Sequence, residues 1–379
     1  MMRSRLVLAA LVTVVAAAPA QAVSGGATMP IAQAPYVSWL GGRCTGTLIS
    51  PTRILTAAHC IDGADIADAQ VLVGVDGNAQ TSGRGKLAVA VRGYTVHPKF
   101  KESFPFAHKR PQDAIAVNDV GMILLKKPIR TIAPVRVAGA GDAALEAPGT
   151  AATILGYGDT APDGPTGPGP KAPLQQGALS VLGESDCAKA YPKAIEATML
   201  CTADGVSMAP PFVMACPGDS GGPVIVQTPT GPVQVGVTSW GAEVMEVGCG
   251  QQRLPDVAMR VSSYAAFINQ ANPVIEPYTT GGFRHTRIVG RARIGSTVTC
   301  TAPKLGGAPA KLSYEWSVGT NTGGFLELRH EHGAKLKITK AIYAKGRPTS
   351  HRILFCIATA RNAGGSLNAG LTSTEMKKS

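Results

Sequence analysis

Alternating apolar and polar residues mark candidate β-strands in the C-terminal third of the chain. Residues 293–300 (RIGSTVTC) follow the period of two that is typical of a half-buried strand. Residues 314–316 (YEW) and the largely apolar run 353–360 (ILFCIATA) come next. The order cysteine, tryptophan, cysteine in this region predicts a small β-sandwich whose disulfide packs against the tryptophan.

A different spacing appears in residues 261–270 (VSSYAAFINQ), where Tyr264, Phe267 and Ile268 recur at helical intervals. This segment predicts a short helix. The whole chain contains 45 glycines and 28 prolines, and only 5% of its residues are aromatic. Such a composition favours short strands joined by turns over long helices. We therefore expect an all-β protein.

The first 22 residues have the organisation of a secretory signal peptide. Arg3 and Arg5 form a charged start, residues 6–18 an apolar run, and residues 20–22 (AQA) a small-residue cleavage site. The apolar run is too short to span a bilayer. We expect a secreted, extracellular protein with no integral membrane segment after signal removal. Eight cysteines in an exported chain predict disulfides, although their spacing alone allows 105 pairings.

Length and charge distribution indicate more than one domain. The chain has 379 residues, more than one typical domain. Residues 278–379 hold 16 Lys and Arg against 4 Asp and Glu, so they carry the entire net charge of +12. Residues 273–277 (PVIEP) have the composition of a short, stiff linker. The basic segment predicts either binding to an anionic surface polymer or only a soluble spacer role.

Two motifs far apart in the chain carry the candidate chemistry. Residues 55–60 (LTAAHC) contain His59, and residues 218–223 (GDSGGP) contain Ser220. A serine hydroxyl is a weak nucleophile at neutral pH and needs a neighbouring imidazole to accept its proton. The glycines allow a tight turn that points the N–H groups of Gly218 and Ser220 at one developing oxyanion. The pair of motifs therefore predicts an acyl-transfer site.

In this order, the two motifs resemble those of the trypsin-like serine endopeptidases of the chymotrypsin fold. The resemblance covers residues 23–272. It implies a double antiparallel β-barrel for that part of the chain. The basic residues 278–379 resemble the small Ig-like modules of secreted bacterial proteins.

The resemblance also implies a triad of His59, Asp119 and Ser220, in which the aspartate orients the histidine and stabilises its charged form. Asp119 precedes the run VGMILL, which resembles a strand of the family. Asp113 is the alternative, but it lacks the Leu-Leu pair that should follow. We expect Asp119 to belong to the triad.

The family's framework implies a specific pairing of the eight cysteines. Cys44 with Cys60 would brace the histidine loop, Cys187 with Cys201 a side loop, and Cys216 with Cys249 the pocket walls. The remaining pair is then Cys300 with Cys356 in the C-terminal domain.

The resemblance assigns a specificity pocket next to the nucleophile. Its residues would be Met214, Ser239, Trp240, Gly241 and Asp256. Trypsin-like pockets carry an aspartate at the base, where this chain has Met214, while Asp256 stands on the opposite wall. We expect a preference for basic side chains with tolerance of hydrophobic ones. In the alternative, Asp256 points away or pairs with Arg253 or Arg260.

The segment Val23-Ser24-Gly25-Gly26 resembles the mature N-terminus of activated relatives and directly follows the expected signal cleavage site. In those relatives the new α-amino group pairs with the aspartate before the nucleophile, here Asp219. Signal cleavage after Ala22 would then create a competent enzyme without a separate activating protease.

The sequence as a whole predicts a secreted serine endopeptidase that hydrolyses protein or peptide substrates through an acyl-enzyme. This chemistry requires no metal or organic cofactor. The alternative is a catalytically silent protein with a protease fold that acts through its Ig-like module.

Overall fold

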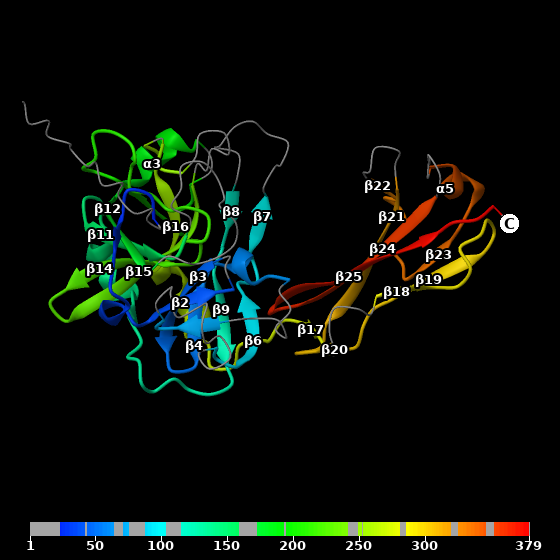
Figure 1. Ribbon diagram of the computed structural model, residues 1–379, viewed down its shortest axis with the longest axis horizontal. Helices are drawn as coiled ribbons and strands as arrows, with labels where there is room; N and C mark the ends of the chain where they lie inside the picture. Colours follow the sequence, from blue (N-terminus) through cyan, green and yellow to red (C-terminus); the bar gives the residue numbers. More distant parts are fainter. Residues whose placement is uncertain are drawn as a thin grey trace, which may run out of the picture.

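The computed structural model describes residues 23–41, 44–63, 71–75, 88–103, 115–158, 173–192, 195–241, 249–251, 253–280, 286–319, 325–345 and 352–378. The expected signal peptide (residues 1–22) and Asp113 lie outside these ranges. Two β-rich parts follow one another along the long axis of the molecule (Figure 1). Among the described helices, none has the length and apolar character needed to cross a membrane.

The first part begins with a six-stranded antiparallel sheet in the order β5-β2-β3-β4-β9-β6. Its strands are β2 (Val37–Leu40), β3 (Cys44–Ser50), β4 (Arg53–Thr56), β5 (Val71–Val73), β6 (Val91–Val96) and β9 (Gly121–Leu125). Every residue of β2 and β9 is buried, because both faces of these strands are covered. Side chains such as Leu48, Ile54 and Ile123 form the core of this sheet.

A second, eight-stranded sheet completes the first part, in the order β1-β12-β11-β14-β15-β16-β13 with β10 paired to β15. Its strands are β1 (Ala27–Thr28), β10 (Arg136–Val137), β11 (Ala151–Gly156), β12 (Gln175–Val181), β13 (Met199–Ala203), β14 (Pro223–Thr228), β15 (Gly231–Gly241) and β16 (Asp256–Arg260). The two sheets are consistent with the expected double barrel.

Short elements connect these sheets. They are η1 (Ile31–Gln33), η2 (Ala58–Cys60), β7 (Lys101–Ser103), β8 (Ile115–Val117), η4 (Ala140–Glu146), α3 (Glu184–Ala190), η5 (Val261–Tyr264) and α4 (Ala265–Ile268). The predicted helix at residues 261–270 is thus shorter than expected and begins as a 3₁₀ turn. Tyr264 and Ile268 are buried, as their spacing predicts.

The C-terminal part contains further sheets, in the orders β18-β19-β23, β22-β21-β24-β25 and β17-β20. Its elements are β17 (Tyr278–Thr279), β18 (Arg287–Val289), β19 (Thr297–Thr301), β20 (Leu305–Gly306), β21 (Lys311–Gly319), β22 (Phe325–Glu327), β23 (Lys335–Lys337), α5 (Lys340–Lys345), β24 (Ile353–Asn362) and β25 (Gly365–Glu375). The strand expected at residues 293–300 begins only at Thr297, because residues 293–296 form a turn closed by the Ser296 amide and the Arg293 carbonyl. The Ig-like assignment stays a prediction.

Four disulfides link the cysteines in the pairing that the resemblance implied. They are Cys44–Cys60, Cys187–Cys201, Cys216–Cys249 and Cys300–Cys356. The last joins β19 to β24, which belong to different sheets, and the indole of Trp316 is buried in the same cluster. This disulfide therefore holds the two sheets of the C-terminal part together.

Candidate active site

The position of His59 follows from the pairing of β4 with β9. Thr56 at the end of β4 lies opposite Gly121 at the start of β9. The 3₁₀ turn η2 follows β4 and contains His59, while Asp119 lies two residues before β9. Strand register thus brings the predicted base and the predicted aspartate to the same edge of the six-stranded sheet.

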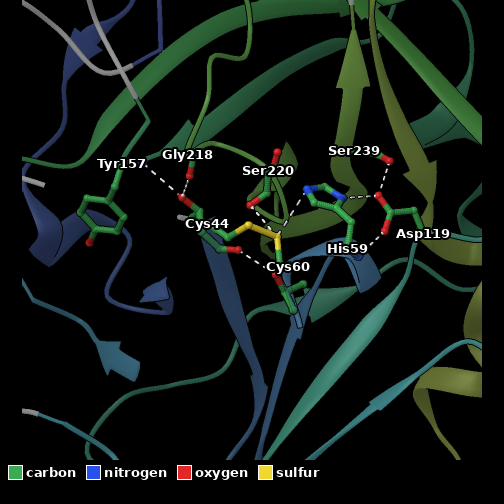
Figure 2. The surroundings of a disulfide bond; sticks show 10 residues. Cys44, His59, Cys60, Asp119, Tyr157, Gly218, Ser220 and Ser239 are labelled. Atoms are coloured by element: carbon green, nitrogen blue, oxygen red, sulfur yellow. Dashed lines mark hydrogen bonds and ion pairs between the residues drawn. A yellow bond between two sulfur atoms is a disulfide. The ribbon is translucent and has the colours of Figure 1, made fainter. Parts of the chain in front are cut away.

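Two hydrogen bonds join His59 to Asp119, one from the imidazole and one from the backbone. The Nδ1 atom of His59 lies 2.7 Å from Asp119 Oδ2, and the backbone N–H of His59 donates to Oδ1 at 2.8 Å. The carboxyl group of Asp119 is fully buried, whereas the side chain of His59 is 16% exposed. The ring is therefore held through Nδ1, while Nε2 lies 3.7 Å from Cys60 Sγ, on the side of Ser220 (Figure 2). The loop of residues 216–222, which contains Ser220, is named here the nucleophile loop after its predicted role.

A third donor reaches the same carboxylate, because the Ser239 hydroxyl donates to Asp119 Oδ2 at 2.5 Å. Burial opposes ionisation of Asp119, but attraction to His59 and the hydrogen bonds from His59 and Ser239 keep its pKa below the usual value. Asp119 is thus a carboxylate at neutral pH. It can stabilise a protonated His59 without taking the proton itself.

The nucleophile loop adopts a turn that places two amides on one side. Gly218 has φ +102°, and a Cβ at this position would lie 2.8 Å from the Cα of Gly158, so only glycine fits. The amides of Asp219, Gly221 and Gly222 donate to carbonyls. Within the described part of the chain, the amides of Gly218 and Ser220 have no such acceptor and are available for an oxyanion.

Figure 2 shows the imidazole of His59 lying between Asp119 and Ser220, beside the Cys44–Cys60 disulfide. Cys44, His59 and Cys60 are the one group of metal-ligand types that gathers among the described residues. Both sulfurs are bonded to each other and cannot act as thiolate ligands. This group therefore lacks the thiolates that a metal site built on it would need.

The protein is similar in sequence to known serine proteases. The sequence model of the Trypsin family matches residues 23–268. The chain belongs to the trypsin family. This protease is 35% identical over 221 residues to a trypsin of Saccharopolyspora erythraea, covering 58% of this chain and 83% of that protein. It is 31% identical over 232 residues to chymotrypsin-C of Bos taurus, covering 60% of this chain and 77% of that one.

A solved structure of neuropsin, a serine protease of mouse brain, aligns with a TM-score of 0.48 and 24% identity, over 64% of this chain and 96% of that one. The family relationship makes this protein a serine-type endopeptidase, and its substrates are proteins or peptides. The family match ends at residue 268, before the C-terminal part begins.

Asp219 of this protease directly precedes Ser220 and is fully buried. Its Oδ1 accepts from the Gly158 amide at 2.8 Å and its Oδ2 from the Cys216 amide at 2.9 Å. Val23, its expected partner, is also fully buried and packs with Ile154 and Leu179. In the continuous chain the nitrogen of Val23 is part of a peptide bond, so an ammonium pair stays a prediction.

Three of the predicted pocket residues lie near the segment that precedes Ser220. Asp256 is 4% exposed and its Oδ2 accepts from the Ala215 amide at 2.9 Å, while β15 places Gly241 directly opposite it. Met214 is also buried, and its sulfur lies 3.1 Å from the Gly250 amide. Asp256 is therefore close to the segment that holds Met214, as the pocket hypothesis requires.

The two arginines considered as alternative partners of Asp256 have other contacts. Arg260 forms an ion pair with Glu146 at 3.1 Å. Arg253 donates to the Asp204 carbonyl and lies over the ring of Phe212.

Sequence reasoning placed Ser239 and Trp240 in the pocket, but their polar groups point elsewhere. The Ser239 hydroxyl is bound to Asp119, and the Trp240 indole N–H donates to the Ala116 carbonyl at 3.1 Å. Their pocket roles stay predictions, which rest on their backbone and ring surfaces.

One supporting residue was not predicted. The Thr45 hydroxyl donates to the Gly218 carbonyl at 2.9 Å and accepts from the Tyr157 amide, and the Thr45 amide donates to the Ser220 carbonyl. Thr45 thus fixes the nucleophile loop from the other sheet. Its position next to Cys44, the partner of Cys60, was the available signal.

Proposed function

We propose that this endopeptidase uses His59, Asp119 and Ser220 as a catalytic triad, with the amides of Gly218 and Ser220 as the oxyanion hole. Ser220 attacks the scissile carbonyl, and His59 accepts the proton and then returns it to the leaving amine. Water hydrolyses the acyl-enzyme by the same proton path in reverse. The observation that carries this proposal is the buried Asp119 carboxylate, which is hydrogen-bonded to the backbone N–H and to the ring Nδ1 of His59.

A phosphonate ester tests the proposal, because such reagents phosphonylate only an activated serine nucleophile. The protein should gain one covalent adduct, and peptide mapping should place it on Ser220. A protein that stays unlabelled at concentrations that inactivate a trypsin would be a catalytically silent member of the family.

We also propose that Asp256 supplies the negative charge that binds a basic substrate side chain, with Met214 providing apolar surface. Asp256 is buried and lies between the Ala215 amide and Gly241. A buried carboxylate is a strong binding partner for a guanidinium or ammonium group. Cleavage should therefore occur after Arg or Lys, and hydrophobic residues should be tolerated.

The variant Asp256→Asn should lose about 10²-fold in kcat/KM for substrates with Arg or Lys, because it removes the charge but keeps an acceptor for the Ala215 amide. Cleavage after Leu, Phe or Tyr should stay constant or improve. A matched set of peptides that differ only at this residue measures the effect. Equal losses on basic and hydrophobic substrates would show that Asp256 has only a structural role.

We further propose that removal of the signal peptide during secretion activates the enzyme. Removal of residues 1–22 would release the α-amino group of Val23, whose ammonium could pair with the buried Asp219. The enzyme would then become competent on export. N-terminal sequencing of the secreted, active protein should begin at Val23, and an active enzyme with any other N-terminus would refute this route.

A further inference from the structure

The C-terminal part contacts the loop that carries His59. The turn between β24 and β25, residues 362–366, is here named the hairpin tip, and it reaches the first part of the molecule (Figure 1). The amide of Ser366 donates to Asp62 Oδ1 at 2.9 Å, and its hydroxyl lies 3.1 Å from both oxygens of Asp62. Asp62 follows His59 by three residues, and its own amide donates to Ala58.

Two further backbone hydrogen bonds cross this junction. The Val96 amide on β6 donates to the Gly364 carbonyl at 2.8 Å, and the Glu276 amide donates to the Tyr94 carbonyl at 2.9 Å. With Ser366, these amides give three reporters of the docked state. The segment predicted as a short, stiff linker therefore takes part in the interface.

Glu276 is the unusual residue of this junction. It is fully buried, and neither of its carboxyl oxygens has a hydrogen-bond partner among the described residues. A Cβ at Gly365 would clash with Glu276 Oε2 and lie 3.2 Å from Asp62 Oδ1. Two carboxyl groups thus converge on the hairpin tip, where the absence of a side chain at Gly365 makes room for them.

A buried carboxylate without a donor or a counter-charge is strongly unfavourable. Burial, and then the charge of Asp62, raise the pKa of Glu276 to about 10. The other ionisable residues on β6, on β17 and at the end of β24, or next to these elements, are Arg92, Tyr94, His97, Tyr278 and Arg361. Glu102 carries a further charge that interacts with Asp62. Both arginines are exposed to solvent, and the charge that acts on Glu276 is that of Asp62. Asp62 accepts hydrogen bonds from Ser366, whereas the carboxyl group of Glu276 accepts none. Glu276 is therefore the carboxyl group that carries a proton in the docked form.

We propose that this junction is a pH-dependent contact, in which the hairpin tip stays docked on the histidine loop while Glu276 is protonated and separates from it when Glu276 ionises. The docked form binds one more proton than the separated form. Docking is therefore strongest below pH 4.5, the ordinary pKa of a glutamic acid side chain, and weakens as the pH rises toward about 10, the pKa of Glu276 in the docked form. The docking equilibrium constant should fall by up to tenfold per pH unit in this range.

Loss of docking removes the hydrogen bonds from Ser366 to Asp62 and so loosens the segment that follows His59. Asp62 and Ser366 are positioning residues in this account, because neither contacts the reacting atoms. The catalytic consequence rests on the proposed role of His59, whereas the docking itself does not.

Hydrogen exchange of the full-length protein between about pH 5 and pH 9 tests the proposal. After correction for intrinsic exchange, the amides of Val96, Glu276 and Ser366 should open more readily as pH rises. In Glu276→Gln, which keeps the shape without the ionisation, opening should be independent of pH. The Leu48 amide, bonded to Tyr36 inside the first sheet, is the internal control.

A second variant separates protonation from simple contact loss. Ser366→Ala should increase opening at every pH by a constant factor, and should leave the pH slope of the wild type unchanged. If Glu276→Gln fails to fold, Asp62→Asn replaces it. Removing the charge of Asp62 should lower the pKa of docked Glu276, so the pH-dependent range of docking should end at a lower pH than in the wild type. On a peptide substrate, kcat of the wild type should fall relative to Glu276→Gln at alkaline pH. Equal pH slopes in the wild type and Glu276→Gln, or a pH-dependent range that is as wide in Asp62→Asn as in the wild type, would overturn the proposal whether or not the protein is a peptidase.

Discussion

Replacing Ser220 by alanine should lower kcat for peptide hydrolysis by about 10⁶-fold and leave the fold intact. The hydroxyl is the attacking group, and His59 has no other alcohol to activate in the proposed triad. The loop should keep its shape, because the hydrogen bond that anchors Ser220 uses its backbone carbonyl and the Thr45 amide. Turnover of a peptide substrate and the melting temperature, measured on the same preparation, separate these two effects.

The matched control is Ser313→Ala, an exposed serine on β21 of the C-terminal part. It should leave turnover unchanged. Phosphonate labelling should disappear in Ser220→Ala and persist in the control. Residual turnover above a few per cent of wild type in Ser220→Ala would assign the nucleophile to another residue.

Asp119→Asn should lower kcat by about 10⁴-fold. The carboxylate accepts three hydrogen bonds, from the His59 amide, His59 Nδ1 and the Ser239 hydroxyl. An asparagine has one oxygen and an NH₂ group in place of the second acceptor, so it cannot accept all three. The NH₂ group facing Nδ1 would favour the wrong tautomer of His59 and would not stabilise the imidazolium.

The control for this variant is Asp113→Asn, which removes the competing candidate from the same region of the sequence. It should be close to neutral in kcat and KM. If Asp113→Asn were the damaging substitution and Asp119→Asn the neutral one, the assignment of the triad would be wrong.

Local patterns predicted those features whose cause is local. The motifs around His59 and Ser220 are each contiguous in the sequence, so these candidate residues could be named from the sequence, and their catalytic roles stay predictions. The strand at residues 353–360 also lies inside β24, because its inward side chains alternate. The strand at residues 293–300 was predicted too long, since the turn that precedes Thr297 is set by backbone hydrogen bonds rather than by side-chain alternation.

Contacts between distant segments were not predictable in the same way. The bond from Ser239 to Asp119 and the two roles of Thr45 depend on how the two sheets face each other. Glu276 was assigned to a short, stiff linker from the composition of residues 273–277, and nothing in that composition indicates burial. Its burial depends on the hairpin tip, which follows it by almost ninety residues, and no local sequence pattern predicts such a contact.

The bond between Ser366 and Asp62 joins positions 304 residues apart, and this separation has a consequence for biosynthesis. Synthesis delivers a chain from its N-terminus, so both sheets around His59 can assemble before the hairpin tip emerges. The loop that contains His59 is thus the first segment of the proposed triad to be synthesised. It is the last to receive its full set of contacts, because Asp62 must wait for Ser366. A recombinant version that ends before β24 should still fold its protease part, but with Asp62 facing solvent throughout its lifetime. Expression of such a truncated chain would therefore yield a protein that differs from the full-length one in the loop that contains His59, even though every residue of the proposed triad is present.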